Sequence, residues 1–214
     1  MGIDRVGNAM AESNDLQLME GLRGAMKVLH FTNSRFADDD TIPDIIRNCG
    51  DITLTSCRPV SLEFIQTQSI DFVVSDRSES LIKQPVLDAL PFRIINLHPS
   101  FLPWNRGYHP DYWACREKTS FGVTIHRIDP GIDTGAILAQ TRVGFSEDDT
   151  LRTTYDRLRG QMVSLFNACW PLLRKNELPD LIQEPLAGSF HLKKDFAGIF
   201  DQLKAGWNTK ISDL

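Results

Sequence analysis

The chain has 214 residues, of which 42% are hydrophobic and 24% are charged, and its formal net charge at pH 7 is −5. This length and composition suit a globular domain with a sizeable core, and the acidic balance excludes a general electrostatic attraction to nucleic acid or to an anionic membrane surface. No apolar run is long enough to span a membrane, and the amino end lacks the basic-then-apolar order of a secretory signal.

Residues 1–25 contain no convincing strand, and we interpret them as an amino-terminal extension, partly helical around residues 16–20. Beyond them, strands are expected at 27–32, 51–55, 71–75, 93–98, 121–128 and 136–143, and helices at 42–48, 61–68, 81–90, 109–117, 150–174 and 195–204. This alternation is typical of right-handed βαβ units and predicts an α/β fold with a doubly wound, mainly parallel sheet. We expect a core domain over residues 26–178 and a short carboxyl-terminal appendage over residues 179–214.

The first predicted strand is not followed by a G-x-G-x-x-G turn, which argues against a dinucleotide-binding site. Asn33, Ser34 and Arg35 stand there instead. At the end of a strand these side chains can contact the polar groups of a substrate, and they serve equally well as helix caps.

The fourth predicted strand ends in the most informative motif of the chain, the run N-L-H-P-S at residues 96–100. Side chains alternate along an extended strand, so Asn96 and His98 point from the same face, roughly 6–7 Å apart. A proline-rich loop follows. Because open α/β sheets place ligands at the carboxyl ends of their strands, Asn96 and His98 are candidate active-site residues.

A carboxylate follows in the turn G-I-D-T-G, at Asp133. An amide, an imidazole and a carboxylate are the groups needed to stabilise an oxyanion, to move a proton and to hold the base in place. Taken alone, Asp133 is also consistent with a turn carboxylate that caps backbone N–H groups. Its combination with Asn96 and His98 favours catalysis, and the sequence leaves open whether His98 or Asp133 is the base.

Three motifs together, N-x-H-P-S at 96–100, G-V-T-I-H at 122–126 and D-T-G-x-I at 133–137, resemble those of the folate-dependent formyltransferases. This family includes glycinamide ribonucleotide formyltransferase, the amino domain of methionyl-tRNA formyltransferase and the sugar N-formyltransferases. The resemblance implies a Rossmann-like formyltransferase fold, 10-formyltetrahydrofolate as the co-substrate and no metal. It places Asn96, His98 and Asp133 on the family's catalytic triad, and Thr124 and His126 on its supporting polar positions.

The resemblance also implies where the formyl donor binds. In the family, a loop after the third strand and the segment that ends at the catalytic aspartate hold the pterin, largely through backbone groups. The corresponding cofactor contacts in this chain are Arg77, Ser80, Leu81, Ile82, Asp129 and Ile132. The loop at residues 75–82 departs from the family's usual small and aromatic composition, and it is also consistent with a solvated loop that carries helix-capping serines.

Two further segments resemble the sugar N-formyltransferases, namely L-P-x-x-R-G-x-x-P at 102–110 and K-K-D-F at 193–196. These enzymes formylate an amino group on a dideoxyhexose carried by a nucleoside diphosphate, commonly dTDP, and we expect such an acceptor, with glycinamide ribonucleotide as the alternative. Cationic side chains would meet the pyrophosphate, and aromatic ones would pack on the base or sugar. The expected substrate contacts are Asn33, Trp104, Arg106, Tyr108, Lys193 and Lys194. On spacing alone, the two lysines are more simply a solvated helix start.

The expected partners follow from the same resemblance. We expect a nucleotide-sugar substrate, no nucleic acid and no membrane, in a cytoplasmic enzyme of lipopolysaccharide O-antigen biosynthesis. No basic domain follows the core, which argues against a tRNA substrate. The apolar side chains of residues 180–214 need a surface to cover them, either the parent domain or a second copy, and we expect a homodimer. A catalytically silent ligand-binding relative would have a broken triad, whereas the triad here is intact.

Overall fold

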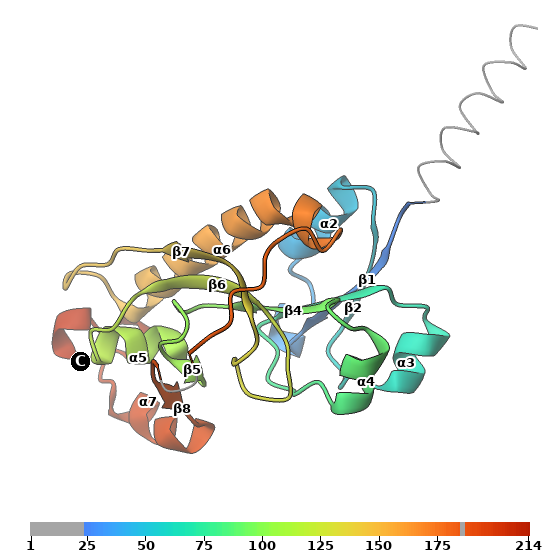
Figure 1. The fold of residues 1–214 in the computed structure, drawn as a ribbon. Coiled ribbons are helices and arrows are strands. Elements are labelled where there is room, and N and C mark those ends of the chain that lie inside the picture. Colours follow the sequence, from blue (N-terminus) through green and yellow to red (C-terminus); the bar gives the residue numbers. More distant parts are fainter. Residues whose placement is uncertain (1–23, 185–186) are drawn as a thin grey trace, which may run out of the picture.

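The computed structural model describes residues 24–184 and 187–214, and the helix expected around residues 16–20 lies outside them (Figure 1). Six strands form the central sheet, in the order β2-β1-β3-β4-β6-β7. They are β1 (Lys27–Thr32), β2 (Ile52–Ser56), β3 (Phe72–Asp76), β4 (Ile94–His98), β6 (Gly122–Arg127) and β7 (Ile137–Arg142). The first four strands are mutually parallel, and β6 is antiparallel to both of its neighbours. The predicted mainly parallel sheet is confirmed.

The reversed direction of β6 was not predicted. β6 and β7 are joined by the short loop at residues 128–136, and a short connection suits an antiparallel pair, whereas parallel strands need a longer crossover. The reversal places Asn96 opposite His126 and His98 opposite Thr124. The predicted catalytic and supporting positions therefore share one end of a strand pair.

Helices cover both faces of the sheet, α2 and α6 on one side and α3 and α4 on the other (Figure 1). The helices of the core are α2 (Thr41–Asn48), α3 (Leu62–Thr67), α4 (Gln84–Ala89), α5 (Pro110–Arg116) and α6 (Leu151–Leu173). Side chains alternate between the two faces along β1. Val28 packs on the face that α6 covers, whereas Leu29 and Phe31 pack on the face that α3 and α4 cover. The predicted doubly wound α/β architecture is confirmed.

Helix α6 is the longest element of the described chain and begins with a capping box at Thr150 and Thr153. The apolar stripe predicted along it is buried at Leu158 and Met162, which confirms that it packs on the sheet. Helix α4 starts three residues later than expected, with Pro85 in its first turn. No helix within residues 24–184 and 187–214 is long and apolar enough to cross a membrane.

The appendage folds back onto its own core domain. It contributes β8 (Phe190–His191), α7 (Ile199–Gln202) and the short 3-10 turns η2 (Lys193–Phe196), η3 (Gly206–Asn208) and η4 (Ile211–Asp213). β8 pairs with β5 (Arg106–Gly107) in a small parallel sheet that was not predicted. Gly188 has a φ of +85°, and a Cβ there would lie 1.9 Å from the carbonyl oxygen of Pro103, so only glycine permits this close approach.

Candidate active site

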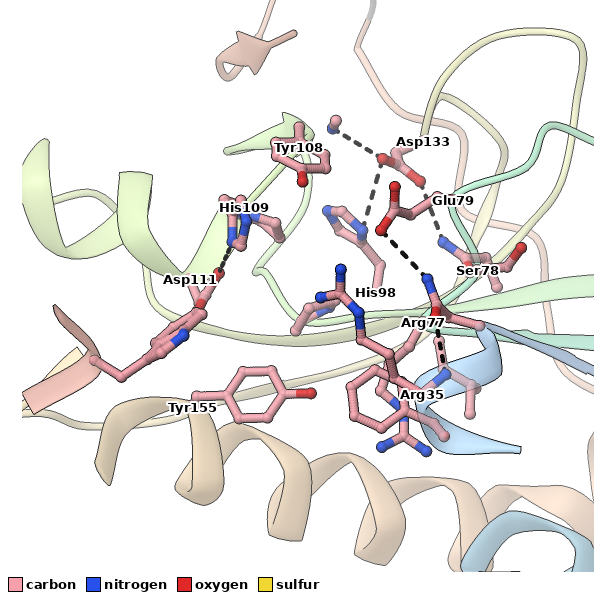
Figure 2. Close-up of a pocket in the computed structure, with 18 of the residues that line it drawn as sticks. Arg35, Arg77, Ser78, Glu79, His98, Tyr108, His109, Asp111, Asp133 and Tyr155 are labelled. Carbon is pink, nitrogen blue, oxygen red and sulfur yellow. Dashed lines mark hydrogen bonds and ion pairs between the residues drawn. The ribbon is translucent and has the colours of Figure 1, made fainter. Parts of the chain in front are cut away.

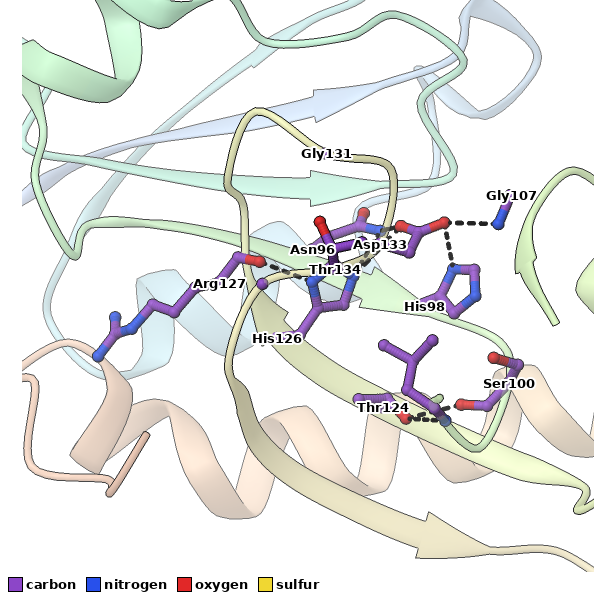
Figure 3. Close-up of polar contacts among 12 residues, drawn as sticks. Asn96, His98, Ser100, Gly107, Thr124, His126, Arg127, Gly131, Asp133 and Thr134 are labelled. Carbon is purple, nitrogen blue, oxygen red and sulfur yellow. Dashed lines mark hydrogen bonds and ion pairs between the residues drawn. The ribbon is translucent and has the colours of Figure 1, made fainter. Parts of the chain in front are cut away.

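The predicted triad residues lie together at the carboxyl end of β4, beside the loop that follows β6 (Figure 3). Asn96 Nδ2 lies 3.2 Å from Asp133 Oδ1 and 3.2 Å from His126 Nε2, and these two acceptors are 3.3 Å apart. The three atoms form a nearly equilateral triangle, so the two acceptors can share one N–H of Asn96, which leaves the other N–H for a ligand.

His98 is buried, and its two ring nitrogens have different surroundings. Nε2 lies 3.2 Å from the carbonyl oxygen of Asn105, which can only accept, so Nε2 carries the proton of the neutral ring. Nδ1 is then unprotonated and lies 3.6 Å from Asp133 Oδ2. Burial lowers the pKa of His98, and the negative charge of Asp133 offsets only part of this effect. The ring is therefore neutral at pH 7, with a free lone pair.

Asp133 stays ionised for a separate reason. Burial alone would raise its pKa, but its interactions with His98, with His126 and with the backbone N–H of Gly107, 2.9 Å from Oδ2, outweigh burial. The pKa of Asp133 is therefore well below its usual range. A carboxylate in this state stabilises positive charge on a neighbour and is a poor proton acceptor at neutral pH.

The loop that carries Asp133 is held from two sides. Asp133 has a φ of +55°, and Asp129 Oδ1 accepts hydrogen bonds from the N–H of Gly131 at 3.1 Å and from Thr134 Oγ1 at 2.7 Å. From the appendage, the buried Gln183 donates Nε2–H to two carbonyl groups of this loop, at 2.9 and 2.7 Å. The position of the carboxylate thus depends on both parts of the chain.

The two supporting positions fix the neighbouring backbone. Thr124 Oγ1 donates to the carbonyl of Ser100 at 2.7 Å and accepts from the N–H of Leu102 at 3.1 Å and from Gln140 Nε2 at 2.9 Å. His126 Nδ1 donates to the carbonyl of the next residue at 2.6 Å, which leaves Nε2 to accept from the amide of the triad. Both residues therefore hold neighbouring groups of the site in position.

Two cavities meet at the triad. The first, which we call the β8 cavity, has a volume of about 360 Å³ and lies between the loops 78–82 and 128–133 and strand β8. Of the predicted cofactor contacts, Ser80, Leu81, Ile82, Asp129 and Ile132 line it. Apolar side chains beside exposed loop backbone suit a flat heterocycle with donors and acceptors on its edge.

The second cavity, which we call the α6 cavity, has a volume of about 420 Å³ and extends from the triad to the start of α6 (Figure 2). The predicted substrate contacts Asn33 and Tyr108 line it. Arg77, which the resemblance assigns to the cofactor, lines this cavity instead, and its guanidinium is tied to Asp39 at 2.7 Å. Asn33 Oδ1 also caps the 3-10 turn that follows β1, the other role that the sequence left open for it, and its contact with a substrate stays a prediction.

Four other predicted substrate contacts lie elsewhere. Lys193 lines the β8 cavity, where Nζ pairs with Glu79 at 3.1 Å. Trp104, Arg106 and Lys194 line neither cavity. Arg106 instead donates to the carbonyl of Ala187 at 3.0 Å, and it thereby helps to hold the appendage on the core.

Several lining residues were not found from the sequence. Gly107 contacts Asp133 through its backbone, and its place in the L-P-x-x-R-G-x-x-P motif was the available signal. Arg152, Tyr155 and Trp207 line the α6 cavity, and no local pattern marks them. They reach the cavity from the first two turns of α6 and from η3, so only the tertiary structure identifies them.

Three side chains of the site could also bind a metal ion, because one potential ligand atom from each lies within 4.8 Å of the other two. They are His98, His126 and Asp133. Both carboxylate oxygens of Asp133 already accept hydrogen bonds, from Asn96 and from Gly107. These bonds account for the cluster without an ion, and the absence of a metal remains a prediction from the sequence.

The sheet order and the cluster at the end of β4 define an α/β protein in which an amide, an imidazole and a carboxylate lie together where two cavities meet. The chain belongs to the formyl transferase family, because residues 59–168, half of its length, match that family. The resemblance indicated by the sequence motifs is confirmed.

Individual relatives share different parts of the chain. The formyltransferase PseJ from Anoxybacillus kamchatkensis, solved with UDP-4,6-dideoxy-4-formamido-L-AltNAc and tetrahydrofolate, is 34% identical with a TM-score of 0.80, over 88% of this chain and 97% of that one. Methionyl-tRNA formyltransferase of Syntrophus aciditrophicus is 34% identical over 64% of this chain and 45% of its own length. The bifunctional polymyxin resistance protein ArnA of Wigglesworthia glossinidia brevipalpis is 27% identical over 72% of this chain and 23% of its own length. This chain spans less than half of these two curated relatives.

Proposed function

We propose that this protein transfers a formyl group from 10-formyltetrahydrofolate to the amino group of a nucleoside-diphosphate-linked amino sugar. The main support for this proposal is that the β8 and α6 cavities meet at Asn96 and Asp133, two residues that line both cavities. A donor in one cavity and an acceptor in the other would bring their reacting atoms together at this shared wall. The PseJ structure, which contains a tetrahydrofolate and a nucleotide sugar together, supports this arrangement.

The β8 cavity fits the formyl donor, which supplies an electrophilic carbonyl carbon when bound. Leu81, Ile82 and Ile132 offer apolar contacts for the pterin faces, and the loop backbone offers hydrogen bonds for its edge. The ion pair between Glu79 and Lys193 lies at the opening of this cavity toward its neighbour.

The triad residues have distinct proposed roles. Neutral His98 would accept at Nδ1 the proton that the attacking amine loses, and ionised Asp133 would stabilise the resulting imidazolium. The imidazolium would then return this proton to the folate nitrogen as the bond between that nitrogen and the formyl carbon breaks. Asn96 directs its second N–H to the formyl oxygen as negative charge develops there. The site thereby favours His98 over Asp133 as the base, the alternative that the sequence left open.

The acceptor is proposed to be an amino-dideoxyhexose on a pyrimidine nucleoside diphosphate. The sequence favours a dTDP sugar, whereas the 34%-identical relative was solved with a UDP sugar, so both belong in the test. A cytoplasmic location and a role in lipopolysaccharide O-antigen biosynthesis are further proposals, which rest on the family resemblance alone.

A formylation assay with 10-formyltetrahydrofolate and a panel of acceptors tests the proposed function. The panel contains UDP- and dTDP-linked amino sugars and glycinamide ribonucleotide, with the product mass as the readout and the H98A variant as the inactive control. We expect a mass gain of one formyl group on at least one nucleotide sugar. A formylated product from glycinamide ribonucleotide alone would replace the proposed acceptor with the alternative.

We also propose a homodimer. Packing on the core buries Phe196 and Ile211 of the appendage, but Ile182 remains 81% exposed beside Phe92, which is 62% exposed. This patch is the proposed contact surface. Sedimentation velocity at micromolar concentration is expected to give about twice the 24.2 kDa chain mass, and a species of one chain mass would contradict the dimer.

A further inference from the structure

Four side chains that line the α6 cavity but not the β8 cavity come from three separate segments. Arg35 comes from the turn after β1, Arg152 and Tyr155 from the start of α6, and Trp207 from the appendage. In Figure 2, Arg35 and Tyr155 extend into the cavity from the side opposite Tyr108. None of the proposed steps at the triad uses these four side chains.

The arginines around this cavity fall into two groups. Arg77 and Arg159 are neutralised, because both guanidinium groups pair with Asp39, at 2.7 and 3.2 Å, and with the buried Asp76, at 3.1 and 2.9 Å. Arg35 lines the cavity with no carboxylate within ion-pair distance in the described part of the chain, and the same holds for Arg152 within residues 24–184 and 187–214.

The acidic side chains that line the cavity form no ion pair with Arg35 or Arg152 within the described residues. Glu79 is paired with Lys193, and Asp133 is held in the triad. Asp111 is buried, with a side chain only 5% exposed, and its Oδ1 lies 3.8 Å from His109 Nδ1. Two guanidinium groups without a carboxylate partner therefore face the cavity, and a ligand with two negative charges would supply a partner for each of them.

Trp207 adds an aromatic surface beside these charges. Its ring is half-buried and packs against Tyr155, with ring centroids 6.1 Å apart, and against Phe200 at 5.7 Å. These contacts fix the indole, and its remaining surface lines the cavity. A ring supported in this way can stack on a flat heterocycle at little cost in side-chain entropy.

We propose that Arg35 and Arg152 bind the diphosphate of the acceptor and that Trp207 packs against its pyrimidine base. This inference rests on the proposed function and adds a nucleotide subsite to it. The diphosphate lies between the sugar, which points toward the triad, and the base, which points toward the appendage. Affinity for the nucleotide then depends on three segments that are distant in the sequence.

Isothermal titration of the full chain with UDP and with dTDP tests the subsite. R35Q and R152Q are each expected to weaken binding of the diphosphate by about 10- to 100-fold, the loss of a charge-assisted hydrogen bond, and to reduce its dependence on salt. W207A should weaken binding without changing the salt dependence. R58Q is the matched control, because Arg58 is exposed and lines neither cavity, and it should bind as the wild type does.

The outcomes separate this inference from the function on which it rests. If the wild type binds UDP or dTDP and both arginine variants bind it equally well, the diphosphate lies elsewhere, while the proposed reaction stands. Unchanged affinity in W207A alone overturns the base contact. If the wild type binds neither nucleotide and formylates only glycinamide ribonucleotide, the proposed acceptor and the subsite both fail. Equal melting temperatures among the variants exclude unfolding as the cause of weaker binding.

Discussion

His98 and Asp133 lie side by side, and both pKa values are lowered, with opposite consequences for charge. Burial lowers the pKa of His98 and leaves the base neutral, whereas neighbouring donors and histidines lower the pKa of Asp133 and leave it negative. Neutral His98 can therefore take up a proton, and the adjacent negative charge of Asp133 stabilises the imidazolium that forms.

Replacement of single triad residues should reduce turnover sharply without loss of the fold. N96A, H98A and D133A are each expected to lower kcat at least about a hundredfold, because each removes an oxyanion donor or a proton-transfer group. Steady-state kinetics with the best panel acceptor measures the effect, and circular dichroism checks the fold. The losses in double variants should not add, since the groups act on one intermediate. A variant with near-normal kcat would remove that residue from the mechanism.

The pH dependence of kcat follows from the lowered pKa of His98. As the pH falls through this pKa, the imidazole is protonated and can no longer accept the proton of the amine, so kcat falls on the acid side. The midpoint of this limb is expected below the ordinary histidine value of 6.5. In D133N, which lacks the charge that favours the imidazolium, the midpoint should move to still lower pH. A midpoint above 7 that changes with the amine of each acceptor would assign the limb to the substrate.

At the scale of the elements, a buried ion pair connects the start of β2 with the end of α6. The Asp51 carboxylate is fully buried and accepts from Arg174 Nε at 2.8 Å, from Trp170 Nε1 at 3.2 Å and from the N–H of Met26 at 2.9 Å. These bonds hold the long helix on the sheet at the end away from the active site.

Loss of this carboxylate should destabilise the whole domain. D51A leaves a guanidinium and an indole N–H without their acceptor, and the free energy of unfolding is expected to fall by about 3–5 kcal/mol. Urea unfolding followed by tryptophan fluorescence measures the change. The control is D148A, because the Asp148 side chain is 97% exposed and should leave the midpoint almost unchanged. A D51A midpoint equal to that of the control would mean that packing alone holds α6.

The regular spacing of side chains along strands and helices allowed much of the arrangement of β4 and α6 to be predicted. Asn96 and His98 could be placed on one face of β4 from their spacing, and the apolar stripe of α6 identified its buried side. Hydrogen bonds over long sequence separations carry no such signal. Gln183 contacts the carbonyl of Asp133, 50 residues away, and nothing in the sequence near Gln183 specifies that partner.

At the scale of the whole molecule, the appendage completes the site. It supplies Gln183 to the loop of Asp133, Lys193 to the β8 cavity and Trp207 to the α6 cavity. The sequence left open whether its apolar side chains cover the parent domain or a second copy. Phe196 and Ile211 pack into the main core, so one chain covers part of the appendage, while the exposed apolar side chains include Leu181, Ile182, Phe190, Leu192 and Phe200.

Docking of the appendage should depend on Gly188. In G188A the new Cβ would meet the carbonyl oxygen of Pro103 at 1.9 Å, so the chain between the core and β8 must shift. We expect faster amide hydrogen exchange over residues 187–196 and a KM for the acceptor raised at least about tenfold, because walls of both cavities move with this segment.

G198A separates this clash from backbone strain. Gly198 also has a positive φ, of +76°, but a Cβ there meets nothing within 4 Å. Both variants therefore carry the strain of a left-handed residue, of order 1–3 kcal/mol, and only G188A carries the clash. Equal exchange rates and equal KM values in the two variants would show that the close approach of Gly188 to Pro103 does not hold the appendage.

The two cavities share a wall at the triad and at Ser78, Glu79 and Tyr108, and each extends away from this wall toward different elements. Neither ligand has to pass through the space of the other to reach the reacting position. For the proposed reaction, the steady-state rate law should therefore be sequential, with random addition of the two substrates, and spent folate should exchange while the proposed acceptor stays bound. Under such a scheme the availability of one-carbon units and the supply of the acceptor would limit the flux independently.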